Sequence, residues 1–465
     1  MLNSFLSSLV LFSICFAVTS ANANDMEKMT MQELALQPIA YALTTQIQGQ
    51  DSPYYIRGEW PTLIRSTVLP ALVGIGKLAG RDDEATAFTT ASVVTILGRV
   101  YMDTPELRTN ELFQKISAAI ENAVSTFKRY GDGVTYNFYP PLLVNGVMVH
   151  QPVHMRLADE WRGLTNVPND ADTTSVVQSA LVFNGLINGN FYSPPAETFS
   201  TFSEFKDVNR EPMAYNKKEN LKDTSAFMTW FQDEKSPDMP RDSMAKPEAG
   251  PRIPFSTNDV DCVVNANIFR LKALAQKTDL DGYAESCKMI DQVVQKDLLA
   301  QCGIYYPNSY NLIFSMVQAE QAGDHCLSDS AHAKLVSKLL ATQDVDGAWR
   351  SDDNMWRDPV ISTAFAMDSL LQLGDTSKEP VSSALLKGTH YLLTQGQMKK
   401  HVPLHWPSDG FFTATARARS LIVWRSEAYT NSIVGAVLLK MHQKFPQYEV
   451  HKYLSMRLPS VERVP

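Results

Sequence analysis

The segment of residues 335–374 constrains the fold most, because it holds two helices of different character joined by a short turn. Apolar side chains at 335, 336, 339 and 340 share one helical face and polar side chains share the other, which predicts an amphipathic helix. Asp358-Pro359 then opens a helix through Leu373 that is apolar nearly all round, so it should be buried on every side. A half-exposed helix followed by a wholly buried one predicts two layers of helices.

The turn between these helices carries Gln343, Gly347 and Trp349. This spacing resembles the Q-x-x-x-G-x-W turn that is repeated in squalene and terpenoid cyclases, and the segment 387–392 resembles the helix that precedes such a turn. The resemblance covers the C-terminal third of the chain. It implies the α/α toroid shared by terpenoid cyclases, protein prenyltransferase β-subunits and complement-type thioester domains. The sequence therefore predicts an all-α chain with a single α/α toroid.

Starts of apolar inner helices recur near residues 83, 170, 259, 309, 358 and 426, which predicts about six helical hairpins. We divide the chain into a signal peptide (1–23), an N-terminal helical segment (24–80) and the toroid (81–465). Alternating apolar residues predict a β-hairpin insertion at 142–157. Residues 191–257 are rich in proline and polar residues but contain aromatic side chains, which predicts a lid-like loop.

The first residues form an apolar run that leads to Ala21-Asn22-Ala23, the pattern of a signal-peptidase site. No other stretch predicts a transmembrane segment, so we expect an exported protein, either secreted or periplasmic. Four cysteines follow this run, and an even number in an exported protein favours disulfides. Cys302 and Cys326 flank one short helical segment and are the pair that we expect first.

The formal net charge of −8 and the absence of a basic stripe argue against a nucleic-acid partner. No serine-hydrolase elbow, zinc-protease motif, phosphate loop, dinucleotide fingerprint or haem motif is present, and the thioester motif of complement-type domains is missing. Asp261 and Cys262 are adjacent, which does not match the spaced zinc ligands of prenyltransferases.

The motif Asn-Asp-x-Asp occurs twice, each time at the start of a predicted inner helix, as Asn169-Asp170-Ala-Asp172 and Asn258-Asp259-Val-Asp261. Asparagine and aspartate are common at helix N-termini, so capping is one interpretation. The other follows from the resemblance, because type II terpenoid cyclases carry Asp-x-Asp-Asp-Thr, whose second aspartate protonates the substrate. It implies Asp172 and Asp261 as the acids, with Asp170 and Asp259 beside them. Both copies lack the third aspartate.

Parallel inner helices bring their N-termini to one mouth of a toroid, where further side chains are expected to contact a ligand. The predicted ligand-binding residues are Asn169, Asn258, Tyr305, Tyr306, Trp349, Trp356, Trp406, Arg425 and Glu427. Aromatic side chains stack on sugars and also shelter isoprenoids. The four aspartates are alternatively hard oxygen ligands for Ca²⁺. His150 and His154, in the predicted hairpin, are a further pair near the mouth.

Two functional classes remain open. The first is an enzyme with paired aspartate acid/base groups acting on an isoprenoid-like or glycan substrate, either terpenoid cyclase-like or like an (α/α)6 glycoside hydrolase or lyase. The second is a non-catalytic binding protein for a small molecule, lipid, glycan, Ca²⁺, or a host or envelope protein. A raised pKa on one of the aspartates would favour the enzyme, because an acid must hold its proton near the working pH.

Overall fold

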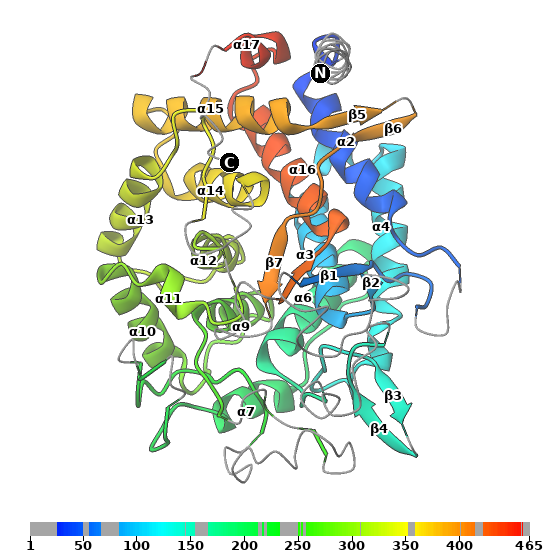
Figure 1. The fold of residues 1–465 in the computed structure, drawn as a ribbon, viewed down its shortest axis with the longest axis vertical. Helices are drawn as coiled ribbons and strands as arrows, with labels where there is room; N and C mark the ends of the chain where they lie inside the picture. The colour runs from blue at the N-terminus through cyan, green and yellow to red at the C-terminus, as the bar shows by residue number, and fades with distance from the viewer. Residues whose placement is uncertain are drawn as a thin grey trace, which may run out of the picture.

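The computed structural model describes residues 26–49, 55–66, 83–144, 146–153, 166–212, 216–217, 221–232, 250–251, 253, 257–306, 308–351, 359–399, 401–413, 422–456 and 458 (Figure 1). The predicted signal peptide, Trp356 and His154 lie outside these residues. The segment 67–82 and parts of the predicted lid also lie outside them.

The described chain is mostly helical, with small strand pairs. Its longer helices are α2 (Met31–Thr44), α3 (Ala87–Asp103), α4 (Glu111–Val124), α6 (Ala171–Asn188), α7 (Ala196–Glu204), α9 (Cys262–Leu274), α10 (Tyr283–Gln295), α12 (Asn311–Gln321), α13 (Asp329–Ala341), α14 (Pro359–Leu373), α15 (Glu379–Gln395) and α16 (Glu427–Lys444). The short helices are α11 (Leu299–Cys302) and α17 (Val450–Leu454). The strands are β1 (Thr62–Ser66), β2 (Asp83–Glu84), β3 (Pro141–Val144), β4 (Val147–His150), β5 (Gln397–Lys399), β6 (Val402–His405), β7 (Gly410–Thr413) and β8 (Ile422–Arg425).

The helices form an inner and an outer layer. The inner helices α3, α6, α9, α12, α14 and α16 each pack against the next, and α16 packs back against α3, so the contacts close a ring. Their residues are buried on every side, as in α14, where residues 360–371 are all buried. The outer helices bury one face only, as α13 does with Ala331, Leu335 and Leu339. Figure 1 shows α10, α13 and α15 along the rim, outside α9, α12 and α14.

The turn around Trp349 joins three helices. Its indole Nε1 donates to the Leu339 carbonyl in α13 (2.8 Å), and its backbone N–H donates to Thr363 Oγ1 in α14 (3.0 Å). The Gln343 amide donates to the carbonyls of Gly347 (2.9 Å) and of Ala384 in α15 (2.8 Å). Gly347 has φ +87°, and an added Cβ would lie 2.4 Å from the Lys387 carbonyl oxygen. The motif residues therefore fix an outer helix, an inner helix and the next outer helix.

The structure contains a second turn of this kind, which sequence analysis missed. Trp60 donates from Nε1 to the Ala42 carbonyl in α2 (2.9 Å) and from its backbone to Thr90 Oγ1 in α3 (3.1 Å). The Gln46 amide donates to the carbonyls of Gly58 (2.9 Å) and of Ala119 in α4 (2.8 Å). The longer chain between Gln46 and Trp60 hid the pattern.

A third turn places Trp406 in the same way. Its Nε1 donates to the Leu392 carbonyl in α15, and its backbone N–H donates to Asn431 Oδ1 in α16, each at 2.8 Å. These bonds repeat the link from an outer helix through a tryptophan turn to the following inner helix.

The strands differ in part from the sequence prediction. Strands β3 and β4 pair antiparallel, from Pro141↔His150 to Val144↔Val147, as the predicted hairpin. The prediction of a helical segment over 24–80 is wrong at Thr62–Ser66, which forms β1 in a four-stranded sheet of order β2-β1-β8-β7. Strand β1 finds its partner β8 about 360 residues later in the chain, a pairing that no local pattern reveals.

The disulfide pairing corrects the prediction. The bonds are Cys262–Cys302 and Cys287–Cys326, with Cα–Cα distances of 5.4 and 5.3 Å, so the expected Cys302–Cys326 pair is wrong. Cys262 begins α9 and Cys302 ends α11, and the fold brings these two ends together. Closeness along the sequence was a poor guide, because helix packing determines which cysteines meet.

Among the described helices, none combines the length and the apolar character that a membrane crossing requires.

Candidate active site

The two Asn-Asp-x-Asp motifs have different positions relative to their helices. Asp170 is the N-cap of α6 and Asp172 lies in the first turn. In the other copy, Asp261 is the N-cap of α9 and Asp259 precedes the helix. The motifs are therefore offset by two residues, and Asp170 corresponds in structure to Asp261. Asp172 is the one aspartate of the four that lies inside a helix.

Asp172 is a buried carboxyl with two side-chain donors from different elements. It is 4% exposed. Its Oδ1 accepts from the Asn267 amide in α9 (2.8 Å), and its Oδ2 accepts from the Tyr306 hydroxyl. Burial raises the pKa of Asp172 to about 6, although both hydrogen bonds and the Arg270 charge act in the opposite direction. This carboxyl can hold or release a proton near neutral pH.

Asp170 lies beside Asp172, and its carboxyl has fewer hydrogen-bond partners. Its Oδ1 accepts from the Thr173 backbone N–H (2.6 Å), whereas its buried Oδ2 has no hydrogen-bond partner among the described residues. Burial, followed by the neighbouring Asp172 charge, raises the pKa of Asp170 well above its ordinary value. Two adjacent carboxyls that both disfavour ionisation can share a site only if at least one keeps its proton.

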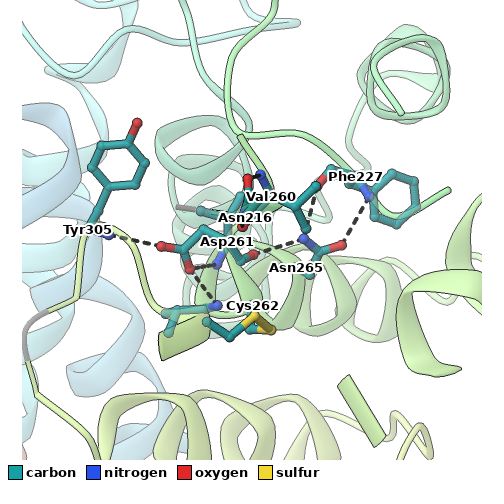
Figure 2. Close-up of a disulfide and its surroundings, with 10 residues drawn as sticks. Asn216, Phe227, Val260, Asp261, Cys262, Asn265 and Tyr305 are labelled. Atoms are coloured by element: carbon teal, nitrogen blue, oxygen red, sulfur yellow. Dashed lines mark hydrogen bonds between the residues drawn. A yellow bond between two sulfur atoms is a disulfide. The ribbon is translucent and has the colours of Figure 1, made fainter. Parts of the chain in front are cut away.

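Asp261 is held by backbone groups. Its Oδ1 accepts from the N–H groups of Val263 (2.7 Å) and Val264 (3.3 Å), and its Oδ2 accepts from the Tyr305 N–H (2.9 Å). Figure 2 shows this carboxylate between the start of α9 and Tyr305. Burial raises the pKa of Asp261 to about 7. These contacts describe a helix cap that also anchors the Tyr305 loop.

Asp259 accepts from two hydroxyls, Thr229 Oγ1 (2.5 Å) and Tyr305 (2.6 Å). Burial raises its pKa. Tyr305 in turn accepts from the Trp230 indole (2.9 Å). Through Asp259, Asp261 and Asp172, the dipeptide Tyr305-Tyr306 contacts three of the four aspartates. Cys302, bonded to Cys262, lies just before this dipeptide and fixes its loop to α9 (Figure 2).

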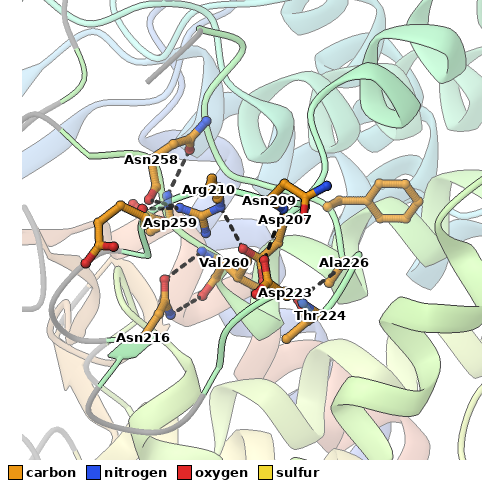
Figure 3. A network of polar contacts seen from close by, with 12 residues as sticks. Asp207, Asn209, Arg210, Asn216, Asp223, Thr224, Ala226, Asn258, Asp259 and Val260 are labelled. Carbon is orange, nitrogen blue, oxygen red and sulfur yellow. Dashed lines mark hydrogen bonds and ion pairs between the residues drawn. The ribbon is translucent and has the colours of Figure 1, made fainter. Parts of the chain in front are cut away.

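The two asparagines of the motifs hold backbone segments in place. Asn258 accepts from the Trp230 N–H (3.0 Å) and donates to its carbonyl (2.7 Å). Arg210 pairs with Asp207 (2.7 Å) and donates to the Asn258 carbonyl (2.8 Å), as Figure 3 shows. Asn169 donates to Thr135 Oγ1 (2.7 Å). These contacts support the helix starts.

The remaining predicted ligand residues that the structure describes have contacts or burial of their own. Trp349 and Trp406 are fully buried in their turns. Glu427 accepts from the Tyr41 hydroxyl (2.7 Å), and Arg425 donates to the Ser408 carbonyl (3.1 Å). The His150 ring lies 3.0 Å from the Tyr139 carbonyl.

A cavity of about 20 Å³ lies within the ring of inner helices, enough for about one or two water molecules. Asp172 does not line it, but its two donors, Asn267 and Tyr306, do. The lining residues are Phe88, Ser92, Thr95, Ile96, Val176, Val263, Asn267, Arg270, Tyr306, Asn311, Phe314, Ser315, Gln318 and Tyr429. Sequence analysis missed Asn267, Arg270 and Asn311. Their signal was a polar or charged residue within the buried part of an inner helix.

The four aspartates do not fit Ca²⁺. Within the described residues, no group of three His, Cys, Asp or Glu side chains is arranged to hold a metal ion. The oxygens of Asp172, Asp259 and Asp261 all accept from N–H or O–H donors, whereas Ca²⁺ requires six to eight oxygens directed at one point.

No protein-family model matches the chain, and no curated protein matches it in sequence. Its structure is similar to that of the type II terpene cyclase MstE from Scytonema, bound to its product merosterolic acid A, with a TM-score of 0.53 and 12% identity. The match covers 91% of this chain and 99% of that one. The chain has a terpenoid cyclase-like fold.

Two further structures agree. MstE bound to its substrate geranylgeranyl dihydroxybenzoate matches with a TM-score of 0.51 and 12% identity, over 91% of this chain and 99% of that chain. A protein from Actinoplanes matches with a TM-score of 0.52 and 11% identity, over 88% and 99% of the two chains. The resemblance inferred from the Gln343–Trp349 turn is thereby confirmed at the level of the fold.

Proposed function

We propose that this protein is an isoprenoid-processing enzyme in which Asp172 supplies the proton that starts a cyclisation. One observation carries the proposal: a buried carboxyl with a pKa raised to about 6 contacts two side chains that line a cavity inside the ring, and this cavity has to widen to admit an isoprenoid. Such a pKa lets a carboxyl keep its proton near working pH. The terpenoid cyclase-like fold supports the substrate class, because solved relatives of this fold bind a prenylated substrate and its product.

The proton passes through Tyr306 in this proposal. In its protonated form Asp172 donates to the Tyr306 oxygen, which frees the Tyr306 O–H to point into the cavity. As Asp172 gives its proton to Tyr306, Tyr306 gives its own to an alkene carbon of the substrate. The alkene π electrons form the new C–H bond and leave a cation on the adjacent carbon, while Asp172 becomes a carboxylate. A later loss of a proton from the cyclised cation, with reprotonation of Asp172 from solvent, completes the cycle.

The side chains around the cavity suit such a cation. Phe88, Phe314 and Tyr429 line it from α3, α12 and α16. Aromatic ring faces stabilise positive charge by about 0.5–2 kcal/mol each. The Asp172 carboxylate that remains after the transfer keeps its bonds from Asn267 and Tyr306 and the favourable charge of Arg270.

We further propose that the scaffold is a single α/α toroid of about six hairpins, supported by the closed ring of inner helices. Export from the cytoplasm is also proposed, and two disulfides support it because such bonds persist in oxidising compartments.

A non-catalytic binding role is the second candidate, and the lining of the cavity favours it. Ser92, Thr95, Asn311, Ser315 and Gln318 contribute polar groups to a small space, which suits a small polar ligand.

The proposal is tested by incubating the protein with linear prenyl substrates that have neutral or acidic ends and analysing the products by mass spectrometry. We expect a product of unchanged mass with fewer double bonds. Asp172→Asn should lower its rate by about 100-fold or more. Asp329→Asn, an exposed aspartate in the first turn of α13, is the matched control and should retain the rate. Binding without turnover in the unaltered protein would favour the second candidate.

A further inference from the structure

Arg270 is a buried cation that faces the cavity without a full set of partners. It lies in α9, one turn beyond Asn267, and is 7% exposed. Its Nε has no hydrogen-bond partner among the described residues. Burial lowers the pKa of Arg270 to about 10, and Arg99 acts in the same direction. A buried guanidinium left short of acceptors is costly, and proteins seldom keep one without a use.

A second unpartnered donor lines the same cavity. The Oδ1 of Asn311 accepts from Ser315 Oγ (3.0 Å), whereas its Nδ2 is buried with no hydrogen-bond partner among the described residues. Asn311 is 2% exposed and belongs to α12, the helix next to α9 in the ring. Two residues from neighbouring helices thus line one cavity, and each has a buried donor with no hydrogen-bond partner among the described residues.

The other carboxylates near Arg270 in the described part of the ring are paired with other cations. Lys440 and the Gln318 amide occupy the two oxygens of Asp368, and Arg99 lies 3.8 Å from Asp103. Asp172 is the carboxylate that offsets the charge of Arg270, and it does so through space. When Asp172 holds the proton that the proposed reaction requires, this compensation disappears.

We propose that Arg270 and Asn311 form an oxyanion-binding subsite, and that the substrate is an isoprenoid bearing a carboxylate or a phosphate. The isoprenoid part rests on the proposed function, whereas the oxyanion part rests on these two side chains. A guanidinium fork and an amide N–H are donors that suit such oxygens. Binding places a negative charge near Asp172, which favours its protonated form. The substrate therefore promotes protonation of the acid that acts on it.

The charged and titratable groups around Asp172 set the direction of this coupling. They are the N-cap Asp170 of α6, the N-cap Asp261 and Arg270 of α9, Tyr306 between α11 and α12, Tyr429 in α16 and, around Arg270, Arg99 in α3. The bound anion adds a like charge to the carboxyls, and the two tyrosines stay neutral because burial raises the pKa of each. Uptake of a proton on binding is therefore assigned to the carboxyls. Asp172 and Asp261 both have a pKa near neutrality, and Asp172 is the one of the two that interacts with Arg270.

Calorimetry with ligands that share one tail tests this inference. Farnesoic acid and farnesyl diphosphate differ from farnesol in the head group, and inorganic pyrophosphate and acetate are the head groups alone. At about pH 7 we expect at least one of the two acidic ligands to bind about tenfold or more tightly than farnesol. Repeating the titration in buffers of different ionisation enthalpy should show proton uptake, and Asp172→Asn should abolish that uptake.

Arg270→Gln should remove the preference for the acidic ligand and leave farnesol binding within about twofold. Arg57→Gln makes the same charge change at an exposed site and should leave the preference intact. Arg270→Lys keeps the positive charge and should retain part of the preference for the acidic ligand. The test therefore stays valid if one of the two Arg270 variants fails to fold.

The outcomes separate the two proposals. Farnesol that binds as tightly as both acidic ligands would overturn the subsite and leave the isoprenoid function standing. Pyrophosphate or acetate that binds through Arg270, with no gain from any prenyl tail, would support the subsite and overturn the isoprenoid function. No binding of any of these ligands would overturn both.

Discussion

Replacing Asp172 by asparagine should stabilise the protein at high pH and leave its stability nearly unchanged at low pH. The pKa of Asp172 in the folded protein is about 6, against an ordinary value of 3.8. The folded state therefore holds this proton more tightly than the unfolded state. The stabilisation from that proton is fully present below the ordinary pKa and is lost as pH rises through about 6.

The size of the effect follows from the shift. A rise from 3.8 to about 6 corresponds to about 3 kcal/mol of stability lost above neutral pH. Asparagine has nearly the same shape, can accept from Asn267 and can donate to the Tyr306 oxygen, so it keeps both contacts without a charge. For a chain of this length, 3 kcal/mol corresponds to a change of about 3 °C in Tm.

The assay is thermal unfolding of both proteins between about pH 5 and about pH 8, with Asp329→Asn as the control. The Tm of Asp172→Asn should rise above that of the unaltered protein progressively as pH increases. A Tm difference that is the same at both ends of the range, or a variant that is less stable at high pH, would refute a raised pKa at Asp172.

Three further predictions concern the proton transfer through Tyr306, the turn at Gly347 and the Cys262–Cys302 disulfide. Tyr306→Phe should lower turnover by about 100-fold if the proton passes through Tyr306. If turnover is instead retained, and the pH above which the rate falls moves to a higher value, Asp172 donates its proton directly. Gly347→Ala should lower the free energy of unfolding by about 2 kcal/mol or more in denaturant unfolding, since its Cβ would meet the Lys387 carbonyl. Gly146→Ala is also at positive φ but has open space around it, and it should cost about 1 kcal/mol. Equal losses would contradict the steric argument. Cys302→Ser opens a loop of 40 residues and should lower the free energy of unfolding by about 4 kcal/mol in the same measurement under oxidising conditions. An unchanged stability would show that the Cys262–Cys302 bond does not form.

Periodicity and turn chemistry predicted much of the fold. The apolar helix that ends at Leu373 and the Gln343–Trp349 turn were sufficient to suggest two helical layers, because burial on every side requires an all-apolar helix. The turn at Gln46–Trp60 escaped notice because inserted residues separate its glutamine from its glycine. Strand β1 could not be predicted, since its partner β8 lies at the other end of the chain.

The candidate site was only partly predictable. The two acidic motifs mark real helix starts, but the sequence could not show that they are offset by two residues relative to those helices. This offset distinguishes Asp172, which has side-chain donors, from Asp261, which caps a helix. Arg270 and Asn311 come from helices that meet only in the folded ring, so their common orientation toward one cavity is a property of tertiary structure.

The central claim is that Asp172 supplies a proton to an isoprenoid substrate. It is tested most directly by running the reaction in deuterated water and counting deuterium in the product by mass spectrometry. The account predicts a cyclised product that carries deuterium at the carbon protonated first, formed by the unaltered protein and by Asp329→Asn but not by Asp172→Asn. A product without deuterium, or one that Asp172→Asn forms at the same rate, would contradict it.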